Sequence, residues 1–122
     1  MTTFAMVGAV LSGLGVALGA FGVHGLAGVL VPADLAVFET GVRYQMYHAL
    51  ALVVLGLPGT RLSHALAKAA GWLFVLGVVL FSGSLYGLTL VGPRSLGMVT
   101  PFGGVTLLAG WGCLAAACWR ER

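Results

Sequence analysis

The chain has 122 residues, of which 60% are hydrophobic and 7% are charged. A typical soluble domain carries about 25% charged residues, so this chain cannot cover a soluble fold of its size with polar side chains. Its net charge of +3 comes from scattered residues without a basic run, which argues against a nucleic-acid-binding surface and nucleic-acid partners.

The first apolar segment, residues 4–23, contains no charged residue. It is long enough to span a membrane, which takes about 20 mostly apolar residues. A cleaved signal peptide is the alternative, but it would carry Lys or Arg before the apolar run. The sequence has Met1, Thr2 and Thr3 there, so we expect a retained membrane helix.

The second segment, residues 35–57, holds most of the polar residues of the apolar segments. Asp34 is the expected N-cap of its helix, and Pro58 and Gly59 are a helix stop. The second half is an uninterrupted apolar run, whereas the first half contains a polar set: Glu39, Thr40, Arg43, Tyr44, Gln45 and His48.

The third and fourth expected helices are residues 69–91 and 99–119. A short basic connection, residues 61–68, precedes the third, and a Gly-Pro turn at residues 92–95 precedes the fourth. Connections this short make consecutive helices antiparallel neighbours. We therefore predict an all-α integral membrane protein, with residues 1–122 forming a single antiparallel four-helix transmembrane bundle.

The charges of the connections predict how the bundle is oriented. The 1–2 and 3–4 connections carry Asp34 and Arg94, whereas the 2–3 connection and the C-terminus carry most of the basic residues: Arg61, Lys68, Arg120 and Arg122. Positive residues gather on the cytoplasmic side, so both termini should be cytoplasmic.

Small residues recur at four-residue spacing, which lets membrane helices pack backbone to backbone. We expect these pairs to pack inside the bundle rather than to form a dedicated dimer face. They are Gly8/Ser12, Gly15/Gly19, Gly83/Gly87 and Gly112/Ala116.

The polar side chains should gather in the outer half of the membrane, by the rise of about 1.5 Å per helical residue. Glu39 and Arg43 are four residues apart on one helix face, and a charge at membrane depth is costly, so we expect them to pair. The alternative is that these residues only join the second helix to its neighbours. The candidate cluster or ligand site comprises His24, Glu39, Arg43, Tyr44, His48, Ser82, Ser84 and Tyr86.

No catalytic set can be drawn from the sequence. It offers no Ser-His-Asp set, phosphate loop or paired carboxylates, and no His, Cys, Asp and Glu set has metal-ligand spacing. We therefore predict no catalytic residue, no metal, no cofactor and no enzyme activity. His48 lies nearest the midplane, where it could carry a proton or bind a metal or haem, but we expect a neutral histidine hydrogen-bonded to a neighbour.

Four sequence runs resemble the YwdK/YgdD-like family of small bacterial inner-membrane proteins of unknown function, which has a mitochondrial relative in animals. The runs are residues 18–26 (LGAFGVHGL), 38–50 (FETGVRYQMYHAL), 81–86 (FSGSLY) and 100–104 (TPFGG). The resemblance implies a four-helix, multi-pass protein of the bacterial inner membrane and supplies no activity.

Three functional hypotheses follow. The first is a non-enzymatic structural, accessory or lipid-interacting bundle, whose partners are the lipid bilayer and either a second copy or another membrane protein. The alternative is a small transporter or channel for protons, ions or a small solute, with His48 as a relay. The third is a membrane-embedded binder of a cofactor or ligand.

Overall fold

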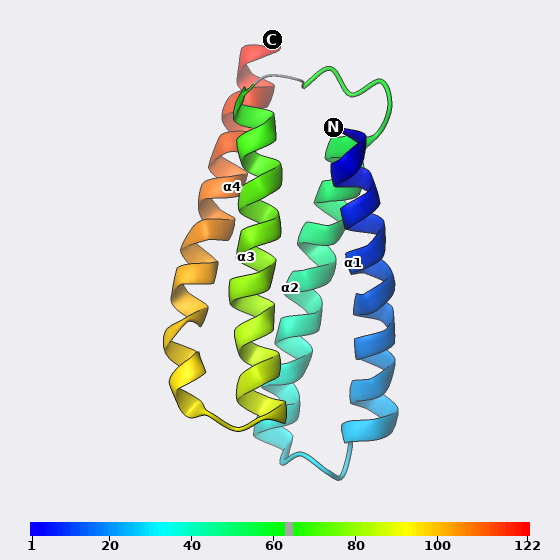
Figure 1. Cartoon of the computed structure of the whole chain (residues 1–122), viewed down its shortest axis with the longest axis vertical. Coiled ribbons are helices and arrows are strands. Elements are labelled where there is room, and N and C mark those ends of the chain that lie inside the picture. The colour runs from blue at the N-terminus through cyan, green and yellow to red at the C-terminus, as the bar shows by residue number, and fades with distance from the viewer. Residues whose placement is uncertain (63–64) are drawn as a thin grey trace.

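The computed structural model describes residues 1–62 and 65–122, which form four long helices (Figure 1). These are α1 (Thr2–Phe21), α2 (Pro32–Gly56), α3 (Ala65–Leu90) and α4 (Thr100–Arg120). A π-helical turn, η1 (Gly22–Leu26), follows α1, and a 3-10 turn, η2 (Arg94–Met98), precedes α4. The four predicted helices are confirmed. The predicted basic connection falls partly on residues 63 and 64, which lie outside the described residues.

The helices run alternately up and down, and both termini lie at the same end of the bundle (Figure 1). Extensive packing joins α1 to α2, α2 to α3, and α3 to α4. The α2–α3 pair is therefore the centre of the bundle, with α1 and α4 on its flanks. This confirms the predicted antiparallel, all-α architecture.

An apolar core fills the half of the bundle nearest the termini. Its aromatic members are Phe4 and Phe74, and Phe74 is completely buried. The other members come from α2, α3 and α4: Leu52, Leu55, Ala67, Ala70, Val78, Leu107 and Ala117. These side chains pack closely against one another in the interior of the bundle.

Glycines set how closely the flanking helices approach the central pair. A Cβ on Gly8 would lie 2.7 Å from the backbone nitrogen of Val53. A Cβ on Gly103 would lie 2.7 Å from the Cα of Phe81. Backbone atoms cannot move aside as a flexible side chain can, so the close approach of α1 to α2, and of α4 to α3, requires glycine at these positions.

The glycine pairs expected to pack inside the bundle divide into two groups. Gly8 and Gly15 are buried against α2, as expected. By contrast, no atom lies within 4 Å of a Cβ built on Gly83 or Gly112. Gly83 and Gly112 therefore leave open space on the surfaces of α3 and α4.

The start of α2 differs from the prediction. The helix begins at Pro32, with Val31 as its N-cap, and no side chain caps it. Proline suits this position because its missing N–H would have no helical acceptor there. Asp34 therefore lies inside the first turn rather than at the N-cap.

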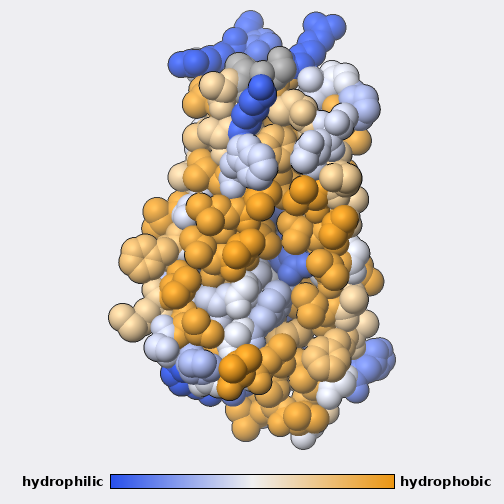
Figure 2. All heavy atoms as spheres, viewed as in Figure 1, coloured by the Kyte–Doolittle hydropathy of each residue, from blue (hydrophilic) through white to orange (hydrophobic). Residues whose placement is uncertain are grey.

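Large apolar side chains cover the outside of the bundle (Figure 2). Among the described residues, three stretches are long and apolar enough to cross a membrane: Thr2–Leu26, Ala65–Leu90 and Arg94–Arg120. The α2 helix has 25 residues but carries Asp34, Glu39 and Arg43. An apolar exterior of this kind requires hydrocarbon rather than water around it.

Candidate functional site

Gln45 is the centre of a hydrogen-bond network that joins α1, α2 and α3. Its Nε2 donates to the carbonyl oxygen of Leu11 at 2.8 Å, and its Oε1 accepts from the Tyr86 hydroxyl at 2.7 Å. Close by, the Ser82 hydroxyl donates to the carbonyl oxygen of Gly41 at 2.6 Å. Gln45 and Ser82 are both buried, so their polar atoms need these partners.

The Tyr86 ring reaches Gln45 because position 41 is glycine. A Cβ on Gly41 would lie 2.8 Å from Cε1 of Tyr86. On its other side the ring packs against Phe38, with 5.2 Å between the ring centroids. The position of the Tyr86 hydroxyl therefore depends on a small residue in α2 and an aromatic residue one turn before it.

A groove of about 550 Å³ lies between α1 and α3, next to this network. Gln45, Ser82 and Tyr86 line it together with a larger set of apolar residues and one glycine: Leu11, Leu14, Ala17, Leu18, Phe21, Val78, Val79 and Gly83. In Figure 2, pale and blue atoms lie recessed between apolar ridges in the lower half of the visible face. Among the described residues, no charged side chain lines the groove.

The Gln45 amide retains unused hydrogen-bonding capacity. An amide carries two N–H donors and an oxygen with two lone pairs. One donor is used by Leu11 and one lone pair by Tyr86. The groove therefore combines apolar walls with an amide whose hydrogen-bonding capacity is only partly used.

His48 makes a separate contact, between α2 and α4. Its Nδ1 lies 2.6 Å from the carbonyl oxygen of Tyr44, and its Nε2 lies 3.0 Å from Nε1 of Trp111. A carbonyl only accepts and an indole N–H only donates. Nδ1 therefore carries the proton and Nε2 accepts, which makes His48 the neutral, hydrogen-bonded histidine that the sequence led us to expect.

Aromatic rings surround this histidine. Phe74 and Trp111 lie 5.5 and 5.7 Å from it, measured between ring centroids, and the Tyr44 ring packs against Phe81 at 4.5 Å. Both ring nitrogens of His48 are occupied, and the rings limit access to them. A role as metal ligand would require the Trp111 contact to open first.

The Ser84 hydroxyl joins α3 to the start of α4. It hydrogen-bonds the hydroxyl of Thr100 and also donates to the carbonyl oxygen of Phe81 at 2.8 Å. These contacts hold the chain on both sides of η2. Ser84 is buried and faces away from the groove, so its contacts are structural.

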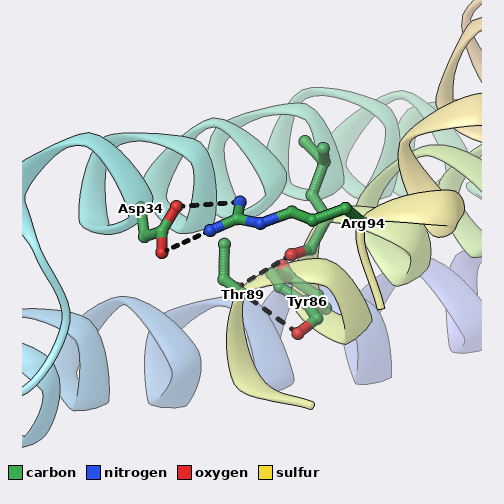
Figure 3. Close-up of polar contacts among 5 residues, drawn as sticks. Asp34, Tyr86, Thr89 and Arg94 are labelled. Atoms are coloured by element: carbon green, nitrogen blue, oxygen red, sulfur yellow. Dashed lines mark hydrogen bonds and ion pairs between the residues drawn. The ribbon is translucent and has the colours of Figure 1, made fainter. Parts of the chain in front are cut away.

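An ion pair closes the end of the bundle away from the termini (Figure 3). Arg94 donates from Nη1 to Oδ1 of Asp34 at 3.1 Å and from Nη2 to Oδ2 at 3.0 Å. Thr89, nearby, donates to the backbone carbonyls of Leu85 and Tyr86 within its own helix. The sequence placed Asp34 and Arg94 at the same end of the bundle but gave no sign that they pair.

Three residues of the predicted cluster lie elsewhere. His24 is exposed in η1. Glu39 and Arg43 lie on the outward side of α2, and neither makes a hydrogen bond or ion pair with another described residue. The expected Glu39–Arg43 pair is therefore not formed, and the predicted cluster divides between the groove, the His48 contact and the outer face of α2.

Sequence reasoning left two central residues out of the candidate set. Gln45 is an amide in the apolar part of α2, and a polar side chain at membrane depth usually has a partner. Trp111 lies within an apolar segment, where its indole N–H also needs an acceptor. The sequence therefore shows that both side chains need a hydrogen-bond partner, but it does not show which residue of another helix is that partner.

Among the residues that the structure describes, no three His, Cys, Asp or Glu side chains lie close enough together to hold a metal ion. The polar side chains near the groove are an amide, a hydroxyl and a phenol. These groups offer hydrogen-bond donors and acceptors and carry no formal charge.

Comparison with known proteins identifies the relatives of this chain. Residues 18–104 match a family described as a protein of unknown function, DUF423. The chain is 47% identical over 112 residues to UPF0382 membrane protein SH2409 of Staphylococcus haemolyticus, covering 91% of this chain and 90% of that protein. No solved structure matches the chain.

Two further relatives match over nearly their whole length. UPF0382 membrane protein YwdK of Bacillus subtilis is 46% identical over 112 residues, which are 91% of each chain. UPF0382 membrane protein SAB0533 of Staphylococcus aureus is 42% identical over 121 residues, which are 98% of each chain. The resemblance seen in the sequence is therefore confirmed, and the chain belongs to the DUF423 (UPF0382) family of membrane proteins, whose function is unknown.

Proposed function

We propose that this protein is a non-enzymatic, multi-pass protein of the bacterial inner membrane that binds a neutral amphiphile in the groove between α1 and α3. The observation that carries the proposal is an apolar groove with the buried amide of Gln45 within it. The amphiphile is one with a hydrocarbon chain and an uncharged carbonyl or hydroxyl group.

The distribution of charge supports cytoplasmic termini. The end with the termini carries four basic side chains and one acidic side chain: Arg61, Lys68, Arg120, Arg122 and Glu121. The remaining charges are two basic and two acidic: Arg43, Arg94, Asp34 and Glu39. The excess of positive charge lies at the terminal end, which is the cytoplasmic signature of short-looped membrane proteins.

The position of the groove supports a ligand that enters from the lipid. Its walls belong to α1 and α3, whose outer faces are apolar. Gln45 lies eleven residues before Gly56, the last residue of α2, or roughly 16 Å from the end of that helix. A ligand whose hydrocarbon chain lies in the groove would place its uncharged polar group beside the Gln45 amide, near the middle of the membrane.

The ligand should be uncharged because none of the described residues that line the groove carries a charge. A charged group at this depth would have no counter-ion and would be costly to bury. A carbonyl of the ligand could accept a hydrogen bond from the second N–H of Gln45, and a hydroxyl could donate one to the Gln45 oxygen. Either group would complete the hydrogen bonding of the amide.

The structure favours binding over conduction. The described part of the terminal half is filled by an apolar core that includes Leu52, Leu55, Phe74 and Leu107. His48, the relay of the alternative transporter hypothesis, has both ring nitrogens occupied by Tyr44 and Trp111. A proton or ion that reached Gln45 would meet hydrocarbon side chains for the rest of its path.

The test uses two glycines that both face open space. Gly83 lines the groove, whereas Gly112 lies on α4 and lines none of the described grooves. Leucine at either position removes the same helix-weakening glycine, but only Gly83→Leu fills the groove. Native mass spectrometry of protein released from its own membrane should show a bound neutral amphiphile on the wild type and on Gly112→Leu.

On Gly83→Leu the bound fraction should fall at least about tenfold, which corresponds to about 1.4 kcal/mol. Equal retention by the two variants would place the bound molecule outside the groove. A wild-type protein that carries no amphiphile, even after incubation with extracted membrane lipid, would refute the proposal itself.

A further inference from the structure

We infer that two copies of this chain pair through the outward face of α2, where Glu39 of each copy binds Arg43 of the other. The inference goes beyond the groove and does not depend on its ligand, because the groove lies between α1 and α3. It concerns Glu39 and Arg43 of α2, two charged side chains that form no ion pair with another described residue.

The outward face of α2 forms a continuous stripe. Its residues recur at intervals of three and four, as one side of a helix requires: Ala36, Glu39, Arg43, Tyr47, Leu50 and Val54. Tyr47, Leu50 and Val54 are 56%, 52% and 63% exposed. The opposite side of α2 is buried against α1 and α3, so the stripe is the part of the helix that the monomer leaves uncovered.

The charges in this stripe lie at membrane depth. Arg43 is thirteen residues and Glu39 seventeen residues before Gly56, or roughly 20 and 26 Å from that end of the helix. The hydrocarbon layer is about 30 Å thick. Charged groups there are usually paired because lipid cannot solvate them, yet neither Glu39 nor Arg43 forms an ion pair with a described residue.

A second copy supplies the missing partners. Two copies in one membrane share an orientation, so a twofold axis along the membrane normal places their α2 helices parallel and makes the interface self-complementary. Glu39 and the partner's Arg43 then differ in height by four residues, roughly 6 Å, which a long arginine side chain covers. The symmetry produces this ion pair twice.

The rest of the stripe is suited to the same contact. Below the charges, Tyr47, Leu50 and Val54 would meet their counterparts across the axis. Beside them, a hollow of about 420 Å³ between α2 and α4 is lined almost entirely by apolar atoms. Side chains of the partner can fill this hollow, which gives the pair the shape complementarity that membrane helices rely on.

An exchange of charge tests the pairing directly. Glu39→Arg gives a chain with two basic residues in the stripe, and Arg43→Glu gives a chain with two acidic ones. The two variants are co-expressed with different affinity tags, and each is also expressed with both tags. The mixed pair should be recovered at least tenfold more than either self-pair, while wild-type copies pair with themselves.

The result separates the proposal from its rivals. An ion pair within one chain, between positions four residues apart, would give no preference for the mixed pair. Charges neutralised by lipid headgroups, or by a different protein, would give none either. Equal recovery of mixed pairs and self-pairs would therefore overturn the proposal.

A second measurement covers the case in which the charge variants fail to insert. Leu50→Cys and the control Leu76→Cys are made in a chain with Cys113→Ala and Cys118→Ala. Leu50 and Leu76 are equally exposed, at 52% and 50%, but Leu76 lies on α3. Oxidation in the membrane should give a disulfide-linked dimer for Leu50→Cys only. Equal cross-linking of both, or none at Leu50→Cys, would contradict the pairing.

Discussion

At the scale of single residues, the bundle is specified by a few polar side chains that bind the backbone of a neighbouring helix. Gln45 binds a carbonyl of α1, and Ser82 binds a carbonyl of α2. The sequence shows which polar residues lie deep in the membrane, because depth follows from position along a helix. It does not show which carbonyl each one meets, since that depends on how neighbouring helices are rotated and spaced.

Tyr86→Phe should destabilise the protein by on the order of 1 kcal/mol. The substitution keeps the ring and removes the hydroxyl that donates to Gln45, which leaves a buried acceptor without its partner. Thermal unfolding in a mild detergent measures the effect.

Tyr44→Phe is the matched control, because it makes the same chemical change at a tyrosine whose hydroxyl has no described partner. It should leave the midpoint of unfolding nearly unchanged. If both variants unfolded at the same temperature, the Gln45–Tyr86 hydrogen bond would not stabilise the bundle.

At the scale of helices, hydropathy predicts the segments well and their ends less well. The α3 helix starts at Ala65 rather than near residue 69, because an exposed lysine such as Lys68 can extend its charged end toward water without ending a helix. The α2 helix starts at Pro32 rather than after Asp34, since proline is favoured in the first turn. Both errors come from treating a polar residue as a boundary.

Gly8→Ala should cost about 1–3 kcal/mol of stability, as overpacking of a tight contact does. The added Cβ would lie 2.5 Å from the carbonyl oxygen of Ala49 and would push α1 away from α2. The change is measured as a shift in the midpoint of unfolding.

Gly13→Ala on the same helix is the control, because no atom lies within 4 Å of its added Cβ. It should be neutral or stabilise the helix by up to about 1 kcal/mol. A larger loss from Gly13→Ala than from Gly8→Ala would mean that α1 packs through a different face.

At the scale of the whole molecule, the sequence predicts the alternation of the helices but not their lateral arrangement. Short connections only require that consecutive helices be neighbours. The placement of α1 and α4 on opposite flanks depends on contacts between helices far apart in sequence, such as Phe4 against Gly71 and Trp111 against His48. The groove between α1 and α3 is a product of this arrangement, so no local pattern could have predicted it.

The orientation of the molecule can be tested by labelling single cysteines in intact cells, in a chain with Cys113→Ala and Cys118→Ala. Ser95 is exposed at the end away from the termini, and Thr2 is exposed at the terminal end. A membrane-impermeant maleimide should label Ser95→Cys in intact cells and Thr2→Cys only after the membrane is permeabilised. The reverse pattern would place the termini outside.

Binding of an amphiphile in the groove can be tested with a photoreactive lipid. The probe is a neutral amphiphile with a diazirine in its hydrocarbon chain, activated in membranes that contain the wild-type protein, and the labelled residues are identified by peptide mass spectrometry. We expect labelling to concentrate on the walls of the groove, at Leu14 and Leu18 of α1 and Val79 of α3. Labelling spread evenly over exposed residues outside the groove, such as Phe102 and Leu108 of α4, would show that lipid only surrounds the bundle.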